Sequence, residues 1–449
     1  MARYLHAVSQ ILVTALTIII PFAFADLTTT IDPSSNWGTW EGWGTSLTWW
    51  AAAFGTRDDL ANIFFTSQTV TLNGVSLPGL DFNIARYNAG ASSWNTINGT
   101  TKMVVSPKMI PSRQIKGFWM DWASTSPSSS SWNWSADLAQ RAMLSIARAR
   151  SANILELFSN SPMWWMCKNH NPFSSDDGSF DNLQSWNYQS HAVYMATVAK
   201  YFSDTWSTKF SSVDPFNEPT ATWWNGKTGT QEGCHFDVST QAAVLNHLRT
   251  ELDSRGLTRA TTTKQPNTLQ NLGSTALAKI ACVNVHGYQY GSGRRDSVRS
   301  LATQYNKKLW QSEYGEGDAT GHDLASNLLL DLRWLKPTAW VYWQVLNGGG
   351  WGLIDADNDK KTIAYDAASK KLVIVAVNWG SAQYLNFDLA KFKTPGVDGA
   401  VVKRCATQIG GTSGKRYVAS SDTAISGTKF WSYFEKEMVQ TFEVDGVVL

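Results

Sequence analysis

Short apolar segments alternate with longer amphipathic ones through most of the chain. Residues 136–149, 188–202 and 240–255 repeat apolar side chains at three- and four-residue spacing, which predicts helices. The short apolar segments are bounded by turn-forming residues and predict strands at 42–47, 80–87, 153–158, 212–219, 282–288, 309–315 and 340–345. Strands that alternate with helices in this way favour a parallel sheet covered by helices.

A further strand is needed near Arg259–Thr263, where the pattern is weakest. With it, eight strands and their outer helices predict an α/β fold, a (β/α)8 TIM barrel over residues 26–362. After residue 362 the pattern changes to short strands separated by turns, at 372–377, 384–389, 400–404, 415–419 and 440–444. We therefore predict a second, antiparallel β-sandwich domain over residues 363–449.

The first 25 residues have the pattern of a secretory signal peptide. An apolar run from Ile11 to Phe24 ends in Ala23-Phe24-Ala25, which fits a small-x-small cleavage site. No later stretch is apolar for long enough to cross a bilayer, so we expect a secreted, extracellular protein with no membrane partner. Sequons at Asn98 and Asn133 are candidate glycosylation sites in such a protein.

Four cysteines bear on the same expectation, because thiols pair in an oxidising compartment. Cys167 and Cys234 both lie in polar loops that follow predicted strands, so we predict a disulfide between them. Cys282 lies in an apolar strand and is expected to be a buried thiol.

Composition excludes one class of partner and favours another. The 38 basic and 36 acidic residues nearly cancel, which argues against a nucleic-acid surface. The 23 tryptophans are an unusually large number. Some fill the core, but aromatic faces also stack on the C–H faces of sugars. The composition therefore favours a carbohydrate as the partner.

Two glutamates end predicted barrel strands. Glu218 lies in Asn217-Glu218-Pro219 after the fourth strand, and Glu313 lies in Gln311-Ser312-Glu313-Tyr314 on the seventh. The carboxyl ends of barrel strands meet at one face, where catalytic groups lie. Either glutamate alone could be an ordinary solvated residue, but together they predict the paired carboxylates of a glycosidase.

These motifs, with a β-domain after the barrel, resemble glycoside hydrolase family 30. The resemblance covers nearly all of the chain beyond the predicted signal peptide. Three further motifs are similar to those of the fungal endo-β-1,6-galactanases of that family: Trp43-Gly44-Thr45-Ser46-Leu47, Val285-His286-Gly287-Tyr288 and Trp351-Gly352-Leu353-Ile354-Asp355. The resemblance implies hydrolysis of the β-1,6-linked galactan side chains of arabinogalactan proteins.

The resemblance also implies residue roles. Glu218 matches the family's general acid/base and Glu313 its nucleophile, in a retaining double displacement. Substrate-binding or positioning roles fall to Trp43, Arg86, Asn217, His286, Tyr288 and Trp343. For Arg86 the alternative is a surface arginine, and for His286 and Trp343 it is a core position. We expect no metal or cofactor, a polysaccharide as the partner, and a monomer.

The sequence departs from the family's pattern in two places. No amphipathic helix is apparent between the eighth strand and the β-domain, and Thr261–Pro266 replaces the acidic turn expected at the fifth strand. Alternatives therefore stay open: a related β-1,6-glucanase or xylanase, an enzyme acting on a glycosylceramide, or a catalytically impaired carbohydrate-binding protein.

Overall fold

The computed structural model describes residues 27–449 apart from residues 35, 73–74, 258–265, 319, 348–350, 352, 354–364, 367–369 and 410–414. The predicted signal peptide and the candidate fifth strand lie outside the described residues. The chain forms two compact units: residues 36–361 with 409–414, and residues 1–35 with 362–408 and 415–449. Among the described residues, no helix combines the length and the apolar character needed to span a membrane.

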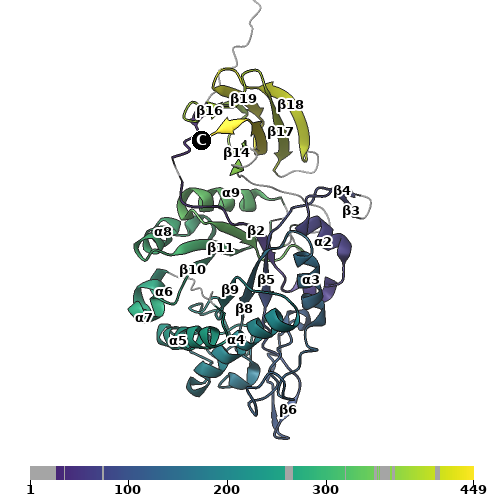
Figure 1. Cartoon of the computed structure of the whole chain (residues 1–449), viewed down its shortest axis with the longest axis vertical. Coiled ribbons are helices and arrows are strands. Elements are labelled where there is room, and N and C mark those ends of the chain that lie inside the picture. The colour runs from purple at the N-terminus through teal and green to yellow at the C-terminus, as the bar shows by residue number, and fades with distance from the viewer. Residues whose placement is uncertain are drawn as a thin grey trace, which may run out of the picture. The chain divides into compact units, whose positions relative to one another are not determined.

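The larger unit is built on a curled sheet of seven parallel strands (Figure 1). In spatial order the strands are β10 (Cys282–His286), β11 (Lys308–Tyr314), β12 (Ala339–Tyr342), β2 (Gly42–Ser46), β5 (Ile84–Asn88), β8 (Ile154–Phe158) and β9 (Ser212–Asp214). Each of these seven overlaps a predicted strand. The barrel topology is thus confirmed. The strands β9 and β10 are the two ends of the described sheet, and the fifth strand of a closed barrel would pair with both.

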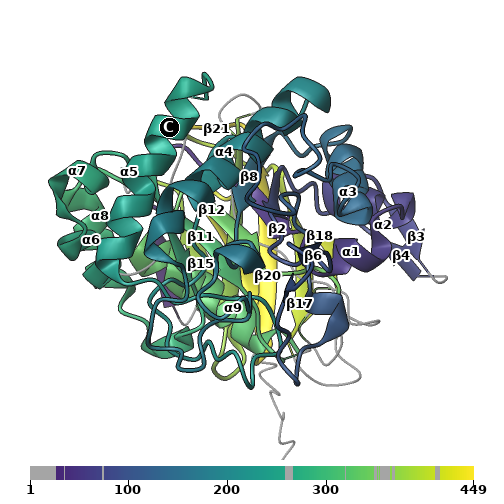
Figure 2. The same cartoon turned by 90° about the horizontal axis from the view of Figure 1, so that it is seen from below.

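In the view of Figure 2, helices lie on either side of the strands of this sheet. They are α1 (Trp50–Phe54), α2 (Asp58–Phe65), α3 (Leu138–Arg148), α4 (Tyr188–Thr205), α5 (Val238–Ser254), α6 (Pro266–Asn271), α7 (Gly273–Leu277), α8 (Arg295–Gln304) and α9 (His322–Leu330), which continues into the π-helical turn η5 (Asp331–Leu335). The three helices predicted from periodicity correspond to α3, α4 and α5. In α3 the buried residues Gln140, Met143, Leu144 and Ala147 recur at three- and four-residue spacing, as an amphipathic helix requires.

Short elements decorate the loops of this unit. Two hairpins are formed by β3 (Val70–Leu72) with β4 (Val75–Leu77) and by β6 (Thr96–Ile97) with β7 (Thr101–Lys102). Single 3-10 turns lie at η1 (Pro111–Arg113), η2 (Trp164–Met166), η3 (Ser185–Asn187) and η4 (Tyr290–Ser292). The segment after β12, where the family's helix was not apparent, lies mostly outside the described residues; 343–347, the part nearest β12, is not helical.

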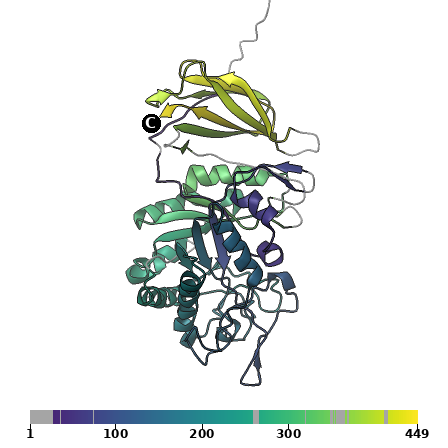
Figure 3. The same cartoon turned by 45° about the vertical axis from the view of Figure 1, so that its right-hand side comes forward.

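The smaller unit has two main sheets (Figure 3). One has the order β13 (Tyr365–Asp366), β14 (Lys371–Asn378), β20 (Met438–Asp445), β17 (Val401–Gln408) and β18 (Val418–Ala424). The other has the order β1 (Leu27–Thr30), β15 (Gln383–Asp388) and β19 (Lys429–Phe434), and β16 (Thr394–Pro395) pairs with β21 (Val447–Val448). Alternate residues of these strands point inward, and Phe387, Phe430 and Phe442 meet in the core between the sheets.

This unit differs from the predicted domain limits at one point. We placed the start of the barrel at residue 26, but β1 pairs in parallel with β15, with Leu27 opposite Leu385. The first described strand, β1, therefore belongs to the β-sandwich, and the larger unit begins at Asn36. The segment is four residues with three consecutive threonines, so its sequence carries no signal of which sheet it joins.

Candidate active site

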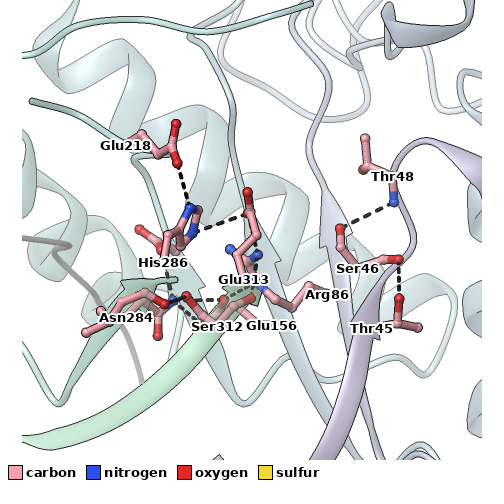
Figure 4. Close-up of polar contacts among 12 residues, drawn as sticks. Thr45, Ser46, Thr48, Arg86, Glu156, Glu218, Asn284, His286, Ser312 and Glu313 are labelled. Carbon is pink, nitrogen blue, oxygen red and sulfur yellow. Dashed lines mark hydrogen bonds and ion pairs between the residues drawn. The ribbon is translucent and has the colours of Figure 1, made fainter. Parts of the chain in front are cut away.

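Glu218, on the loop that follows β9, and Glu313, near the carboxyl end of β11, face a shared histidine (Figure 4). His286 Nδ1 is hydrogen-bonded to Glu218 Oε1 at 2.9 Å, and its Nε2 lies 3.2 Å from Glu313 Oε2. One carboxylate oxygen of Glu218 and one of Glu313 lie within 4.8 Å of each other. The structure thus brings together the two predicted carboxylates and the predicted strand-six histidine.

A β-bulge sets this arrangement. Along β10 and β11, Val285 is opposite Gln311, but the next residue, His286, is opposite Glu313, so Ser312 is an extra residue on β11. An inserted residue redirects the side chains that follow it. Here the shift places Glu313 beside the imidazole that also contacts Glu218.

Besides His286, two further groups of the barrel hold Glu313. Arg86 Nη1 donates to Glu313 Oε2 at 3.0 Å, and the Tyr288 hydroxyl donates to Oε1 at 3.0 Å. The Glu313 side chain is only 5% exposed. A guanidinium in direct contact stabilises the carboxylate over the carboxylic acid. Arg86 and Tyr288, to which the resemblance gives substrate-binding or positioning roles, therefore both contact the candidate nucleophile.

Arg86 is itself fixed from several sides. Its Nε donates to Glu156 Oε1 at 2.8 Å, its Nη1 also donates to the Ser312 carbonyl at 3.0 Å, and its guanidinium lies 4.2 Å from the centre of the Phe158 ring. Burial disfavours the charge of Arg86, but the negative charges of Glu156, Glu313 and Asp214 outweigh it and raise the pKa of the guanidinium. Arg86 is thus a charged positioning residue, not a surface arginine.

Sequence reasoning missed the polar layer beneath Arg86. Glu156 on β8 accepts hydrogen bonds from Ser212 and from Asn284 Nδ2, and the same amide also donates to Asp214 Oδ2 at 3.0 Å. Glu156, Asp214 and Asn284 are fully buried. A signal was available: Glu156 interrupts the apolar strand Ile154-Leu155-Glu156-Leu157-Phe158, and a buried charge needs partners.

Glu218 lies in a different backbone setting. It follows the three-residue strand β9 on a loop and adopts a left-handed conformation with φ of 45°. Such a conformation is uncommon for a non-glycine residue and is often found at functional sites. Its neighbour Asn217 is buried at 2% exposure. The carbonyl of Glu218 accepts a hydrogen bond from the indole of Trp224 at 3.2 Å, which links two parts of this loop.

The two predicted sugar-binding tryptophans have different positions. Trp343 follows β12 and packs edge-to-face on Trp49 at 5.1 Å and on Phe158 at 6.3 Å between ring centres. Phe158 also contacts the guanidinium of Arg86, so its ring lies between Trp343 and Arg86. Trp43 instead packs on Trp40 at 4.6 Å and on Trp340 at 6.2 Å.

The cluster around Trp43 also contains Leu324 and Leu328 of α9. The side chains of a strand alternate between its faces, and Trp43 is on the face that meets the helices. The expectation that Trp43 binds substrate therefore does not agree with its position: the structure places it in the packing between sheet and helix.

The cysteines are four free thiols in the structure, so the predicted Cys167–Cys234 disulfide is not present. Cys167 Sγ lies 3.8 Å from the carbonyl oxygens of Pro162 and Met163, and Cys234 Sγ lies 3.3 Å from that of His235. Burial raises the pKa of Cys167 to about 12. Cys282 is a buried thiol, as expected.

Both candidate glycosylation sites are exposed. Asn98 lies in the turn between β6 and β7, and Asn133 precedes α3. Modification of either asparagine stays a prediction.

Within the part of the chain that the structure describes, two groups of side chains have the donor types of a metal site. Glu218, His286 and Glu313 form one, and Asp181, His235 and Asp237 form the other. In the first, Arg86 already supplies a positive charge 3.0 Å from Glu313, where a cation would be repelled. In the second, the carboxylate oxygens of Asp181 accept hydrogen bonds from the Asp237 amide and the Thr240 hydroxyl, so this carboxylate holds two segments of the chain together.

Comparison with known proteins identifies the family to which this chain belongs. The sequence profile of O-glycosyl hydrolase family 30 matches residues 24–279, more than half of the chain. The chain belongs to this family. It is a glycoside hydrolase, as the paired glutamates at the barrel face predicted.

A relative from Hypocrea rufa, an endo-beta-1,6-galactanase, is 54% identical over 475 positions that cover 97% of this chain and 98% of the relative. These positions outnumber the 449 residues of the chain, so the relative contains residues that have no counterpart here.

Solved structures of the family share the fold. The catalytic domain of a family 30 xylanase C from Talaromyces cellulolyticus superposes with a TM-score of 0.65 at 16% identity, covering 93% of this chain and 100% of that one. A family 30 subfamily 8 xylanase from Clostridium acetobutylicum gives 0.62 at 18% identity, covering 93% and 99%. At these identities the likeness concerns the architecture, a barrel with a β-sandwich.

Proposed function

We propose that this chain is a secreted, monomeric endo-β-1,6-galactanase that cleaves the galactan side chains of arabinogalactan proteins with retention of configuration. The substrate part of the proposal is supported by the 54% identical galactanase, which aligns with nearly the full length of the chain. The apolar N-terminal run with its cleavage pattern supports secretion.

The mechanism rests on one observation, the pair of glutamates joined through His286. Retaining glycosidases hold their carboxyl groups about 5–5.5 Å apart, whereas inverting enzymes need about 6.5–9.5 Å to admit a water molecule. An oxygen of each group lies within 4.8 Å of the other, as the shorter separation of the retaining arrangement requires. In this assignment Glu313 attacks the anomeric carbon while Glu218 gives its proton to the departing oxygen.

His286 fits these opposite protonation states. A neutral imidazole carries one N–H, so it can donate to one group and accept from another. If Nε2–H points to ionised Glu313, then Nδ1 accepts a hydrogen bond that the protonated carboxyl group of Glu218 donates. The resting site then holds one carboxylate and one carboxylic acid, the two species that the first step needs.

The second step reverses these roles. Once the glycosyl ester forms on Glu313, its negative charge is gone and Glu218 is the carboxylate. Glu218 then takes a proton from water as the water attacks the anomeric carbon, and the product leaves with its original configuration. Arg86 and Tyr288 stabilise the carboxylate of Glu313 again when it departs.

The direct test is to incubate the secreted chain with linear β-1,6-galactan, β-1,3-galactan, β-1,6-glucan and xylan, with Glu313→Gln as the control. We expect reducing ends and short oligosaccharides from β-1,6-galactan at a rate well above the others. Preferential cleavage of xylan or β-1,6-glucan would replace the substrate assignment, and binding without cleavage would indicate the carbohydrate-binding alternative.

A further inference from the structure

The loop that follows Glu218 carries two adjacent tryptophans with opposite exposure. Trp224 is buried, whereas the side chain of Trp223 is 57% exposed. Their rings lie 3.6 Å apart between centres and are inclined by 34°. The exposed ring therefore rests on a buried one and does not move freely on a long side chain.

Trp224 is locked in place by its surroundings. Its indole N–H donates to the Glu218 carbonyl, and its ring covers Gly233 so closely that a Cβ there would come within 2.0 Å of it. A Cβ on Gly178 would come within 1.8 Å of the Trp224 carbonyl. Two glycines thus leave room for Trp224, and its hydrogen bond fixes Trp223 relative to the backbone of Glu218.

The chemistry at Glu218 determines what lies near this loop. A general acid protonates the oxygen between the sugar that stays on the enzyme and the sugar that leaves. The leaving sugar must therefore approach the strand end that carries Glu218. A β-galactose ring presents the C–H bonds of carbons 3, 4 and 5 on one face, and such a face packs well on an indole.

We propose that Trp223 is the stacking platform for the galactose unit on the leaving-group side of the scissile bond. The proposal rests on the proposed function and adds a residue that selects polymer over small substrates. Trp223 takes no part in the bond changes: it holds the leaving sugar so that its glycosidic oxygen meets the Glu218 proton.

Two substrates separate this role from a general loss of structure. Linear β-1,6-galactan has a leaving sugar, whereas β-1,6-galactobiosyl fluoride has only fluoride there, which neither stacks nor needs a proton. Trp223→Ala should lower kcat/KM on galactan about 10-fold, equivalent to about 1.4 kcal/mol of transition-state binding. On the fluoride it should match the wild type within about 2-fold, and Trp223→Tyr should restore most of the galactan activity.

The matched control is Trp334→Ala. Trp334 is also exposed, at 47%, but it lies on η5, before the start of β12, with Arg333 over its ring. This variant should keep wild-type activity on both substrates. An equal loss on both substrates in Trp223→Ala, or no loss on galactan, would overturn the proposal. If the wild type cleaves the fluoride but not galactan, the substrate assignment fails instead, and the role of Trp223 is then judged on the polymer that is cleaved.

Discussion

Glu313 and Glu218 are chemically identical side chains in contrasting parts of one barrel. Glu313 belongs to the seven-residue strand β11, is 5% exposed, and contacts Arg86, Tyr288 and His286. Glu218 lies on a loop four residues beyond the short strand β9, has a strained backbone, and is 14% exposed. One glutamate is built into the sheet beside a fixed cation, and the other lies on the more exposed loop that follows its strand.

This contrast assigns the chemistry. A nucleophile must stay ionised and aimed at one carbon, which a rigid strand and a guanidinium provide. A general acid/base must exchange protons with substrate and water, so it needs a more accessible position and a partner that tolerates both of its states. Pairs of titratable groups whose environments differ in this way take different roles in catalysis.

The largest effect should come from Glu313. Glu313→Gln keeps the size of the side chain but cannot form the glycosyl ester, so turnover should fall about 10,000-fold or more. Single-turnover assays with galactobiosyl fluoride measure this directly. A variant that retained a tenth of the wild-type rate would rule out Glu313 as the nucleophile.

Glu218→Ala should discriminate between substrates. Loss of proton donation costs about 100- to 10,000-fold on galactan, whereas formation of the glycosyl-enzyme from a galactobiosyl fluoride needs no proton. Azide should then accelerate turnover and give a β-glycosyl azide, because it replaces water without needing a base. The assignment is wrong if galactan and fluoride lose activity equally and azide has no effect.

Glu156→Gln tests the role of the buried cation Arg86, because it removes one of its ionic partners. Removing one partner of a buried ion pair costs about 3–5 kcal/mol of unfolding free energy, and a less constrained Arg86 should lower kcat on galactan about 10-fold. Chemical denaturation and steady-state kinetics measure the two effects. Asp59→Asn, which breaks the exposed pair with Arg57, is the control and should change neither. Unchanged stability in Glu156→Gln would contradict the network.

A third buried glutamate gives a smaller effect, on stability. Glu232 is fully buried, accepts hydrogen bonds from the Ser92 hydroxyl and the Ile115 amide, and burial raises its pKa to about 8. The folded chain therefore holds this proton where the unfolded chain, with a pKa near 4.5, has released it. Its contribution is complete below about pH 4.5 and is lost as the pH rises to about 8.

Thermal unfolding measured between pH 5 and 8 should show the melting temperature falling with pH, and Glu232→Gln should flatten that fall because an amide has no proton to lose. An identical slope in the variant would show that Glu232 does not carry this dependence. Asp137 is also buried, with its pKa raised to about 7, and adds to this fall, whereas burial lowers the pKa of His191 to about 4 and opposes the fall up to about pH 6.5.

The sequence allowed the frame of this site to be predicted because its signals are local. Apolar strands that end in Glu218 or Glu313 sit next to their own turn residues, and a barrel topology places strand ends together. Contacts between segments that are distant in the sequence leave no such local signal. The side of the sheet that Trp43 faces, the sheet that Leu27–Thr30 joins and the bulge at Ser312 depend on partners far along the chain.

The polar layer beneath Arg86 is an intermediate case. Glu156 could be recognised as an anomaly in an apolar strand, but its partners Ser212 and Asn284 could not be named without the structure. The Cys167–Cys234 prediction failed for a similar reason: positions in loops after neighbouring strands do not fix the direction of a thiol.

The most direct test of the two-glutamate account is the anomeric configuration of the first product. Proton NMR of a galactan digest with excess enzyme, recorded before mutarotation, should show the β-anomer appearing first and the α-anomer growing only later. This follows from carboxylate oxygens within 4.8 Å of each other and a glycosyl ester on Glu313. An α-anomer as the first product would mean inversion by direct attack of water, and would contradict the account.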